Sequence, residues 1–187
     1  MDESNNLAGH LLIAMPAMAD PNFAQTVTYI CEHSDQGTLG LVINRPLDID
    51  LGDVFAQLDL KDCDEEISGQ PVLQGGPVHM ERGFVIHENE QRWENSTTIR
   101  DSIQVTTSRD ILIAMAKGHG PRRATVALGY AGWGAGQLDA EIQSGSWLFA
   151  DATDALVFET PREALYDEAL ASLGLTPSTI VMSPIEA

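Results

Sequence analysis

Three glycines at the carboxyl end of an expected strand form the most suggestive local pattern for ligand binding. Gly132, Gly134 and Gly136 precede a short helix expected from Leu138. Backbone amides at such a bend, together with the positive end of a helix, can hold an anion. A dinucleotide fingerprint would need glycine where Gln137 stands, and no Lys-Ser or Lys-Thr pair follows as in a phosphate-binding loop. An anion or nucleotide site and a plain tight turn, which is the commoner role of glycine, both stay open here.

Two further loops could complete a site around this bend. Asn44-Arg45 ends an expected strand, and Gly75-Gly76-Pro77 forms a rigid turn. The Arg45 guanidinium would bind a carboxylate or phosphate if it lay within about 12 Å of the glycine bend, because small-molecule pockets are compact. In the alternative, Arg45 pairs with a surface acid for roughly 0–1 kcal/mol and the glycines serve only their turns. The candidate ligand-binding residues are Asn44, Arg45, Gly75, Gly76, Gly132, Trp133, Gly134, Gly136 and Gln137.

Signals for catalysis or metal binding are weaker. Cys31 and His33 would share one face of a strand and could form a thiolate–imidazole pair, but no positive residue adjoins Cys31. The five histidines lack both the i, i+4 helical spacing and the Cys-x-x-Cys partners of a zinc site. No serine lies in a Gly-x-Ser-x-Gly elbow. We therefore assign no catalytic residue, no metal and no cofactor. Trp147 is expected in the core, whereas the place of Trp133 stays open.

Short strands mixed with a few helices must position these residues. Without strict alternation of the two, the pattern predicts an α+β fold with a largely antiparallel or mixed sheet. Strands are expected at 11–15, 27–33, 38–44, 72–73, 83–87, 102–106, 125–131, 146–150 and 155–158, with a hairpin turn at 34–37. Helices are expected after the N-cap Asp50, at 109–117 after Ser108, from Leu138 to Gly145, and from a capping box at 160–163 to about Leu173. The acidic stretch 59–66 is expected to be a loop.

Composition excludes several classes of function. The 187 residues fit one domain, and 10 Lys plus Arg against 28 Asp plus Glu give a net charge of −18. Such a charge disfavours generic binding to nucleic acid or to anionic membranes. Two cysteines are too few for a disulfide scaffold, and the amino-terminal apolar run lacks the basic flank of a signal peptide. We expect a cytoplasmic protein.

An ordered set of short motifs, spread over nearly the whole chain, is similar to the bacterial AlgH/YqgE family. The motifs are 11–15, Asp20-Pro21-Asn22-Phe23, Cys31-Glu32-His33, Gly40-Leu41-Val42-Ile43-Asn44-Arg45-Pro46, Gly75-Gly76-Pro77-Val78, Gly83-Phe84-Val85-Ile86-His87, and Gly129-Tyr130-Ala131-Gly132-Trp133-Gly134 with Gln137-Leu138. The resemblance implies a compact single domain over 1–187, with a bifurcated sheet curled into a pseudo-barrel and flanked by helices. It also implies a cytosolic bacterial protein. It implies no activity, although some members bear the label of transcriptional regulator.

These observations lead to two hypotheses of function. In the first, the chain is a non-catalytic binding or regulatory protein that acts through an unidentified protein or small-ligand partner. Direct DNA binding is not expected, because Arg122-Arg123 is the only adjacent basic pair and no basic recognition helix appears. In the alternative, the chain is an anion- or nucleotide-binding enzyme that uses the glycine bend at 132–137.

Overall fold

Within residues 6–88, 93–100 and 103–178, which the computed structural model describes, ten strands form one strongly curled sheet. The strand segments are rich in Val, Ile, Leu and Thr, which suit a half-buried pleated surface. The strands are β1 His10–Ala14, β2 Val27–Ser34, β3 Gly37–Val42, β4 Pro46–Asp50, β5 Pro71–Gln74, β6 Val78–Glu88, β7 Ser96–Arg100, β8 Ile103–Thr106, β9 Ala124–Gly134 and β10 Trp147–Asp151. They run in the order β10-β1-β2-β3-β9-β6-β8-β7, and β5 links β4 to β9.

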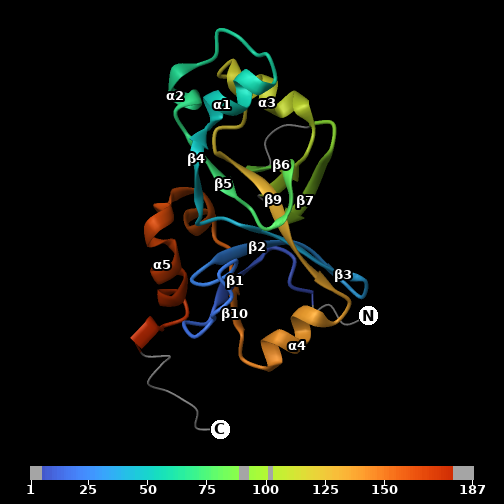
Figure 1. Cartoon of the computed structure of the whole chain (residues 1–187), viewed down its shortest axis with the longest axis vertical. Coiled ribbons are helices and arrows are strands. Elements are labelled where there is room, and N and C mark those ends of the chain that lie inside the picture. Colours follow the sequence, from blue (N-terminus) through green and yellow to red (C-terminus); the bar gives the residue numbers. More distant parts are fainter. Residues whose placement is uncertain (1–5, 89–92, 101–102, 179–187) are drawn as a thin grey trace.

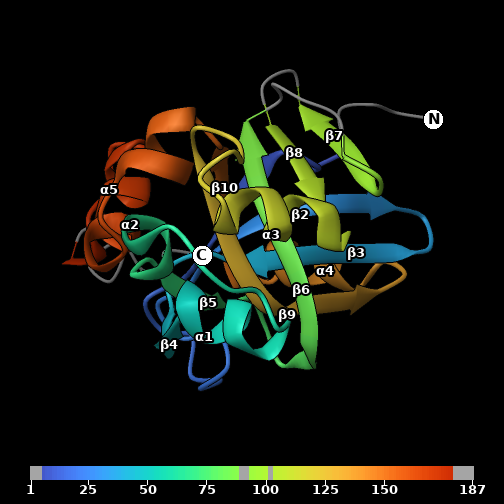
Figure 2. The same cartoon turned by 90° about the horizontal axis from the view of Figure 1, so that it is seen from above.

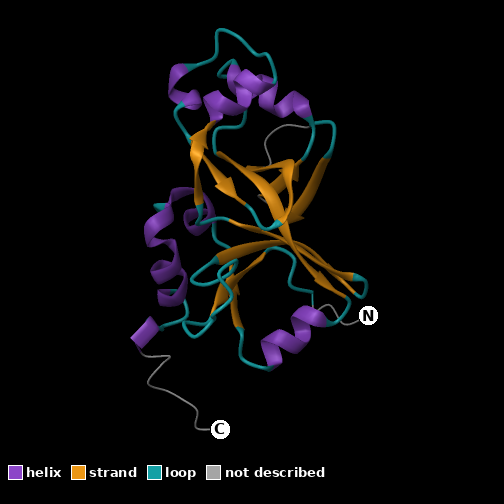
Figure 3. Cartoon of the chain, in the orientation of Figure 1, coloured by secondary structure: helices purple, strands orange, loops and turns teal. Residues whose placement is uncertain are grey.

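Strand β9 is shared by the two halves of this sheet. Its carboxyl end pairs with β3, from Gly40 opposite Ala131 to Gly37 opposite Gly134. Its amino end pairs antiparallel with β6 and parallel with β5. Figure 1 and Figure 3 show β9 running from the strands beneath the upper helices down to β3. The predicted α+β fold with a curled, largely antiparallel sheet is confirmed as a half-barrel flanked by helices.

Helices cover this sheet in three places. Figure 2 shows α1, α2 and α3 together above β5, β6 and β9, whereas α4 and α5 flank the other half (Figure 1). The helical segments are α1 Leu51–Gln57, α2 Glu65–Ser68, α3 Arg109–Ala116, α4 Gln137–Gln143, the π-helical turn η2 Ala155–Glu159, the 3-10 turn η3 Arg162–Ala164 and α5 Leu165–Ala171. No helix among the described residues has the length and hydropathy needed to span a membrane.

Three apolar clusters follow from this arrangement. The largest joins the curled sheet to α5 and contains Tyr29 and Leu165, both fully buried. A second lies beneath α4 and contains Leu138 and Trp147, which confirms the expected place of Trp147 in the core. The third packs α1 and α3 on the sheet around Phe55. Burial of each large apolar side chain stabilises the fold by about 1.5–3 kcal/mol.

Several predicted elements are confirmed by local detail. The β2–β3 hairpin turns where Ser34 pairs with Gly37. Helix α1 begins after Asp50, whose carboxylate accepts from the Asp53 amide at 3.0 Å, while the Asp53 carboxylate accepts from the Asp50 amide at 3.0 Å. Helices α3 and α4 and strand β10 also lie where the patterns placed them. Of the predicted strand 102–106, the first residue lies outside the described residues.

Other expectations were wrong, each for a tertiary reason. Residues 155–158 form the π-helical turn and no strand. The capping box is absent: the Thr160 hydroxyl donates to the Ala155 carbonyl at 2.9 Å, so α5 begins only at Leu165, after η3. In the acidic stretch 59–66, Asp64 caps α2 by accepting from the Glu66 and Ile67 amides. Strands β4 and β7 were not predicted, because their polar sequences become strands only through pairing with β5 and β8.

Candidate functional site

The predicted glycine bend is built differently from the expectation. Gly132 and Gly134 lie within β9, and only Gly136, with φ +74°, lies at the turn into α4. The Gly134 amide donates to Gln137 Oε1 at 2.9 Å, and Gln137 Nε2 donates to Glu141 Oε2 at 2.9 Å. The Gly134 amide is thus satisfied by the side chain of Gln137, the first residue of α4, which in turn donates to the Glu141 carboxylate.

Trp133, at the same bend, is a buried core residue. Its side chain is 6% exposed and its Nε1 donates to Glu141 Oε1 at 3.0 Å. Trp147 Nε1 donates to the same oxygen at 2.9 Å, and the two indole rings meet edge to face with centroids 5.8 Å apart. Glu141 therefore accepts a hydrogen bond from each indole N–H group, and these bonds hold the bend against the apolar core.

Asn44 and Arg45 hold the loop that precedes β2. Asn44 Oδ1 accepts from the Val27 amide at 2.9 Å, and its Nδ2 donates to the Gln25 carbonyl at 3.0 Å. The Arg45 guanidinium donates to the carbonyls of Asn22 and Ala24, both at 2.9 Å. The hydrogen-bond partners of Arg45 are therefore backbone carbonyls, and not the surface carboxylate that the alternative hypothesis expected.

Gly75 and Gly76 lie beside Asn44-Arg45 and against the middle of β9. The Gln74 amide donates to the Arg45 carbonyl at 2.8 Å, and the Val42 amide donates to the Gly75 carbonyl at 2.8 Å. Gly134 pairs with Gly37 at the other end of β3. At about 3.3 Å per residue, the two ends of β3 are roughly 16 Å apart, and Arg45 follows beyond Val42. The structure thus groups residues 44–45 with 75–76 and places Arg45 and Gly134 toward opposite ends of β3, whereas Gly76 lies against Tyr130 and Ala131, directly before Gly132.

Cys31 and His33 do not form the pair that their spacing allowed. Strand β2 has an irregularity between Ile30 and Glu32, which interrupts the regular alternation. Cys31 packs against the largest apolar cluster, and burial raises the pKa of its thiol. His33 Nδ1 accepts from the Leu7 amide at 2.9 Å and its Nε2 lies 3.3 Å from Asp139. Both cysteines are free, and the described residues contain no cluster of potential metal ligands.

A groove of about 580 Å³ lies between the start of β9, the α2–β5 segment and the η2–η3 segment. Its polar wall includes Arg122, Arg123 and Arg162, and we call it the arginine groove. These are three of the ten basic residues of a chain with net charge −18. Its apolar wall includes Leu73 and Phe158. The volume is in the range of small-molecule sites.

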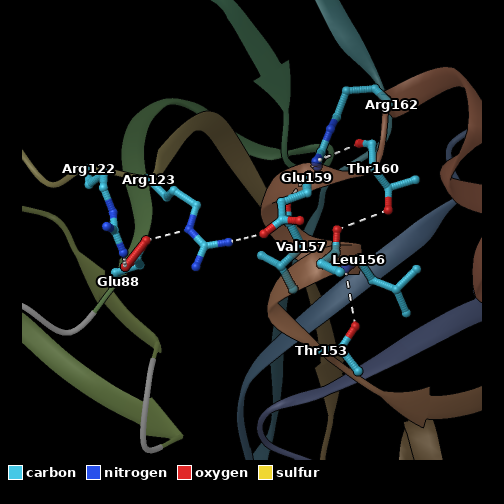
Figure 4. Close-up of polar contacts among 10 residues, drawn as sticks. Glu88, Arg122, Arg123, Thr153, Leu156, Val157, Glu159, Thr160 and Arg162 are labelled. Atoms are coloured by element: carbon cyan, nitrogen blue, oxygen red, sulfur yellow. Dashed lines mark hydrogen bonds and ion pairs between the residues drawn. The ribbon is translucent and has the colours of Figure 1, made fainter.

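Two carboxylates hold Arg123 in this groove (Figure 4). Its Nε donates to Glu88 Oε1 at 2.5 Å, and one Nη donates to Glu159 Oε2. Arg122 adds a contact of 3.3 Å to Glu88 Oε2. The hydrogen bond from Arg123, assisted by that from Arg122, lowers the pKa of Glu88, and the same bond to Glu88 raises the pKa of Arg123.

Arg162 is bound by backbone carbonyls only. One Nη donates to Ile43 O at 2.9 Å, and the other donates to Val157 O at 2.8 Å and Thr160 O at 3.1 Å. Among the residues that the structure describes, no carboxylate forms an ion pair with it. Burial lowers the pKa of the Arg162 guanidinium, and the negative charge of Glu163 partly opposes this effect. This geometry can hold an oxyanion, because an arginine fork binds carboxylates and phosphates.

The sequence patterns do not indicate this groove as a site. Arg122-Arg123 stands in the sequence as an isolated basic pair, and Arg162 lies within the predicted capping box. The scarcity of basic residues was the sequence signal that could have indicated the groove. In so acidic a chain, arginines next to predicted helices and strands are candidates for binding an anion. Their convergence with Glu88 depends on tertiary structure, because these segments are far apart in the sequence.

Comparison with known proteins gives consistent matches over the whole chain. A family model described as AlgH-like matches residues 11–178. A UPF0301 protein of Nitrosospira multiformis is 47% identical over 178 residues, covering 95% of this chain and 96% of the relative. A UPF0301 protein of Ralstonia nicotianae is 48% identical over 179 residues, covering 96% and 94%.

Two solved structures are similar in fold. The solution structure of the AlgH protein from Pseudomonas aeruginosa has a TM-score of 0.81 and 41% identity, covering 100% of this chain and 99% of that one. A crystal structure of a protein from Corynebacterium diphtheriae has a TM-score of 0.75 and 21% identity, covering 99% and 95%. The second supports the fold alone.

Proposed function

The chain belongs to the AlgH-like family, and we propose that this member is a non-catalytic protein that binds a small anionic ligand in the arginine groove. A regulatory effect would follow from that binding. We also propose that it acts in the cytoplasm, which is consistent with two free cysteines. The proposal keeps the expected function and moves the site from the glycine bend to the groove.

The half-buried charge of Arg162 is the observation that carries this proposal. A guanidinium that has lost water and donates its hydrogen bonds to carbonyl dipoles is less stabilised than one that also donates to an anion. A carboxylate or phosphate in the groove would be such an anion. It would accept hydrogen bonds from the N–H groups of Arg162 that do not donate to the three carbonyls. Arg122 and Arg123 would add positive charge on the same wall.

The chemistry of the groove supports binding over catalysis. Its described lining contains no Ser, Cys or His, which are the usual nucleophiles and general bases. The Thr160 hydroxyl already donates to the Ala155 carbonyl. Glu88, the best-held carboxylate nearby, has a lowered pKa and is therefore a poor proton acceptor at neutral pH.

A thermal-shift screen followed by calorimetry tests this proposal. Phosphate, phosphate monoesters and small carboxylates should raise the melting temperature, because a ligand that binds the native state stabilises it by mass action. Arg162→Lys keeps the charge but loses the fork, and Arg122→Gln removes a lining charge, so both should weaken binding. Arg82→Gln is the matched control, because Arg82 is exposed on β6 outside the groove. Binding that is absent, or that is unchanged in both groove variants, would refute the site.

A further inference from the structure

We infer that the Glu159 carboxylate occupies the position that the ligand's oxyanion takes at Arg123, so that the ligand binds by displacing Glu159. This inference rests on the proposed function and adds the mode of binding and the ligand class. The ligand is a carboxylate or phosphate ester with an apolar body. Glu159 is then an internal competitor that sets the affinity of the groove.

The two carboxylates on Arg123 differ in how firmly they are held. The Glu88 side chain is 10% exposed and also contacts Arg122, whereas the Glu159 side chain is 60% exposed. An exposed ion pair contributes only about 0.2–1 kcal/mol, because water competes for both partners. Glu88 is therefore the fixed anchor of Arg123, and Glu159 is the partner that another oxyanion can replace.

The backbone at Glu159 is suited to such an exchange. Glu159 ends the π-helical turn η2, a conformation that is rare and found often at functional sites. The Thr160 amide and hydroxyl both donate to the Ala155 carbonyl at 2.9 Å, which closes this single turn. A change confined to one short turn is enough to withdraw the Glu159 carboxylate.

The same turn connects Glu159 with Arg162. In the view of Figure 4, the Glu159 side chain lies between the guanidinium groups of Arg123 and Arg162. The carbonyls of Val157 and Thr160, on either side in the sequence, accept hydrogen bonds from Arg162. The segment that carries the Glu159 carboxylate therefore also supplies backbone partners of Arg162.

The apolar wall of the groove determines the ligand class. The Arg123 guanidinium lies over the Phe158 ring at 5.7 Å from its centroid, and Ile67, Leu73 and Met115 continue the apolar surface. A free inorganic ion would leave this wall uncovered, whereas an organic group attached to the oxyanion would bury it. An aromatic phosphate ester should therefore bind more tightly than phosphate itself.

Calorimetric titration with inorganic phosphate and with phenyl phosphate tests each part. Glu159→Gln should bind both probes about 1.4- to fivefold more tightly than the wild type, from the roughly 0.2–1 kcal/mol of the lost ion pair. Glu168→Gln is the matched control: it removes the same charge from α5, and Glu168 is exposed and does not line the groove. Its affinity should stay close to the wild-type value. Glu159→Asp keeps the charge but shortens the side chain, and it should share the gain.

The outcomes separate this inference from the proposed function. If neither probe binds any of the chains, the proposed function fails and the inference fails with it. If the probes bind but Glu159→Gln and Glu159→Asp gain no more affinity than Glu168→Gln, the role of Glu159 as a competitor is refuted, whereas the proposed ligand site in the groove is not. If phenyl phosphate binds no more tightly than phosphate, the ligand class is wrong. Circular dichroism of each variant checks that the fold is intact.

Discussion

Glu88 holds two of the three arginine side chains of the arginine groove in place. Its nearly buried carboxylate receives hydrogen bonds from Arg123 and Arg122, and these lower its pKa. A carboxyl group with a depressed pKa in the folded state contributes stability above its unfolded pKa of about 4.3. That contribution is lost as the pH falls through the folded pKa, when the carboxylate becomes protonated. The ion pairs that hold Arg122 and Arg123 therefore depend on pH through the protonation of Glu88.

Glu88→Gln should lower the free energy of unfolding by about 1–2 kcal/mol near pH 7. The difference from the wild type should shrink below about pH 4, where the wild-type carboxyl group also becomes neutral. Urea denaturation at a series of pH values measures it. Glu168→Gln, an exposed acid on α5, controls for the change in net charge. A difference independent of pH would contradict the assigned role.

The two thiols should differ in reactivity. Burial, with a smaller effect of Glu32, raises the pKa of Cys31, so at pH 8 little of it is thiolate, the form that attacks iodoacetamide. Cys63, in the loop before α2, should therefore be alkylated first in the native protein. Mass spectrometry against an unfolded sample gives the order. A Cys31–Cys63 disulfide in protein taken from cells, or faster labelling of Cys31, would overturn this prediction.

At the scale of the elements, the sequence predicted what is encoded by near neighbours. The cap of α1 needs only Asp50 and Asp53, and the β2–β3 hairpin needs only its turn and flanking strands, so both were found. Thr160 looked like a helix cap because its sequence partners fit, but its hydroxyl is used by the carbonyl of Ala155. The π-helical turn has no sequence signature of its own, and β4 exists through pairing with β5.

Two glycines should respond very differently to substitution by alanine. A Cβ at Gly76 would lie 2.1 Å from the Tyr130 carbonyl carbon and 2.5 Å from the Ala131 amide nitrogen, so the crossing of the β5–β6 connection over β9 would have to shift. Gly76→Ala should destabilise the fold by at least about 3 kcal/mol. Gly136→Ala meets no atom within 4 Å and suffers only its positive φ, for about 1 kcal/mol.

Urea denaturation of the two variants measures this contrast. If Gly76→Ala does not fold, far-UV circular dichroism of Gly136→Ala still shows whether the glycine bend is required for the fold. Equal and small effects would mean that the close approach of Gly76 to β9 is unimportant.

At the scale of the whole molecule, charge determines which partners can approach. A net charge of −18 repels a phosphate backbone, and Arg122 and Arg123 already contact Glu88. We expect no specific binding to duplex DNA at physiological ionic strength, as measured by fluorescence anisotropy. Saturable, sequence-dependent binding in the low micromolar range that is lost on changing both arginines to alanine would contradict this.

The groove itself could not be predicted from the sequence. Glu88, Arg123 and Glu159 come from β6, the start of β9 and η2, and only the complete fold places them together. Asn44-Arg45 and Gly75-Gly76 do lie together, as their loop character suggested, but their polar groups hold the backbone. Whether these residues also bind a ligand stays a prediction.

The sharing of β9 has a consequence for the order of events during synthesis. Residues of β3 leave the ribosome about eighty residues before Ala124, and β6 also precedes its partner. Until β9 emerges, the β2–β3 hairpin and the β6–β8 pair each keep an unpaired strand edge, which can recruit strands from other chains. A nascent chain that stalls before Ala124 would retain both open edges, so premature termination there should yield aggregation-prone fragments and not a folded half.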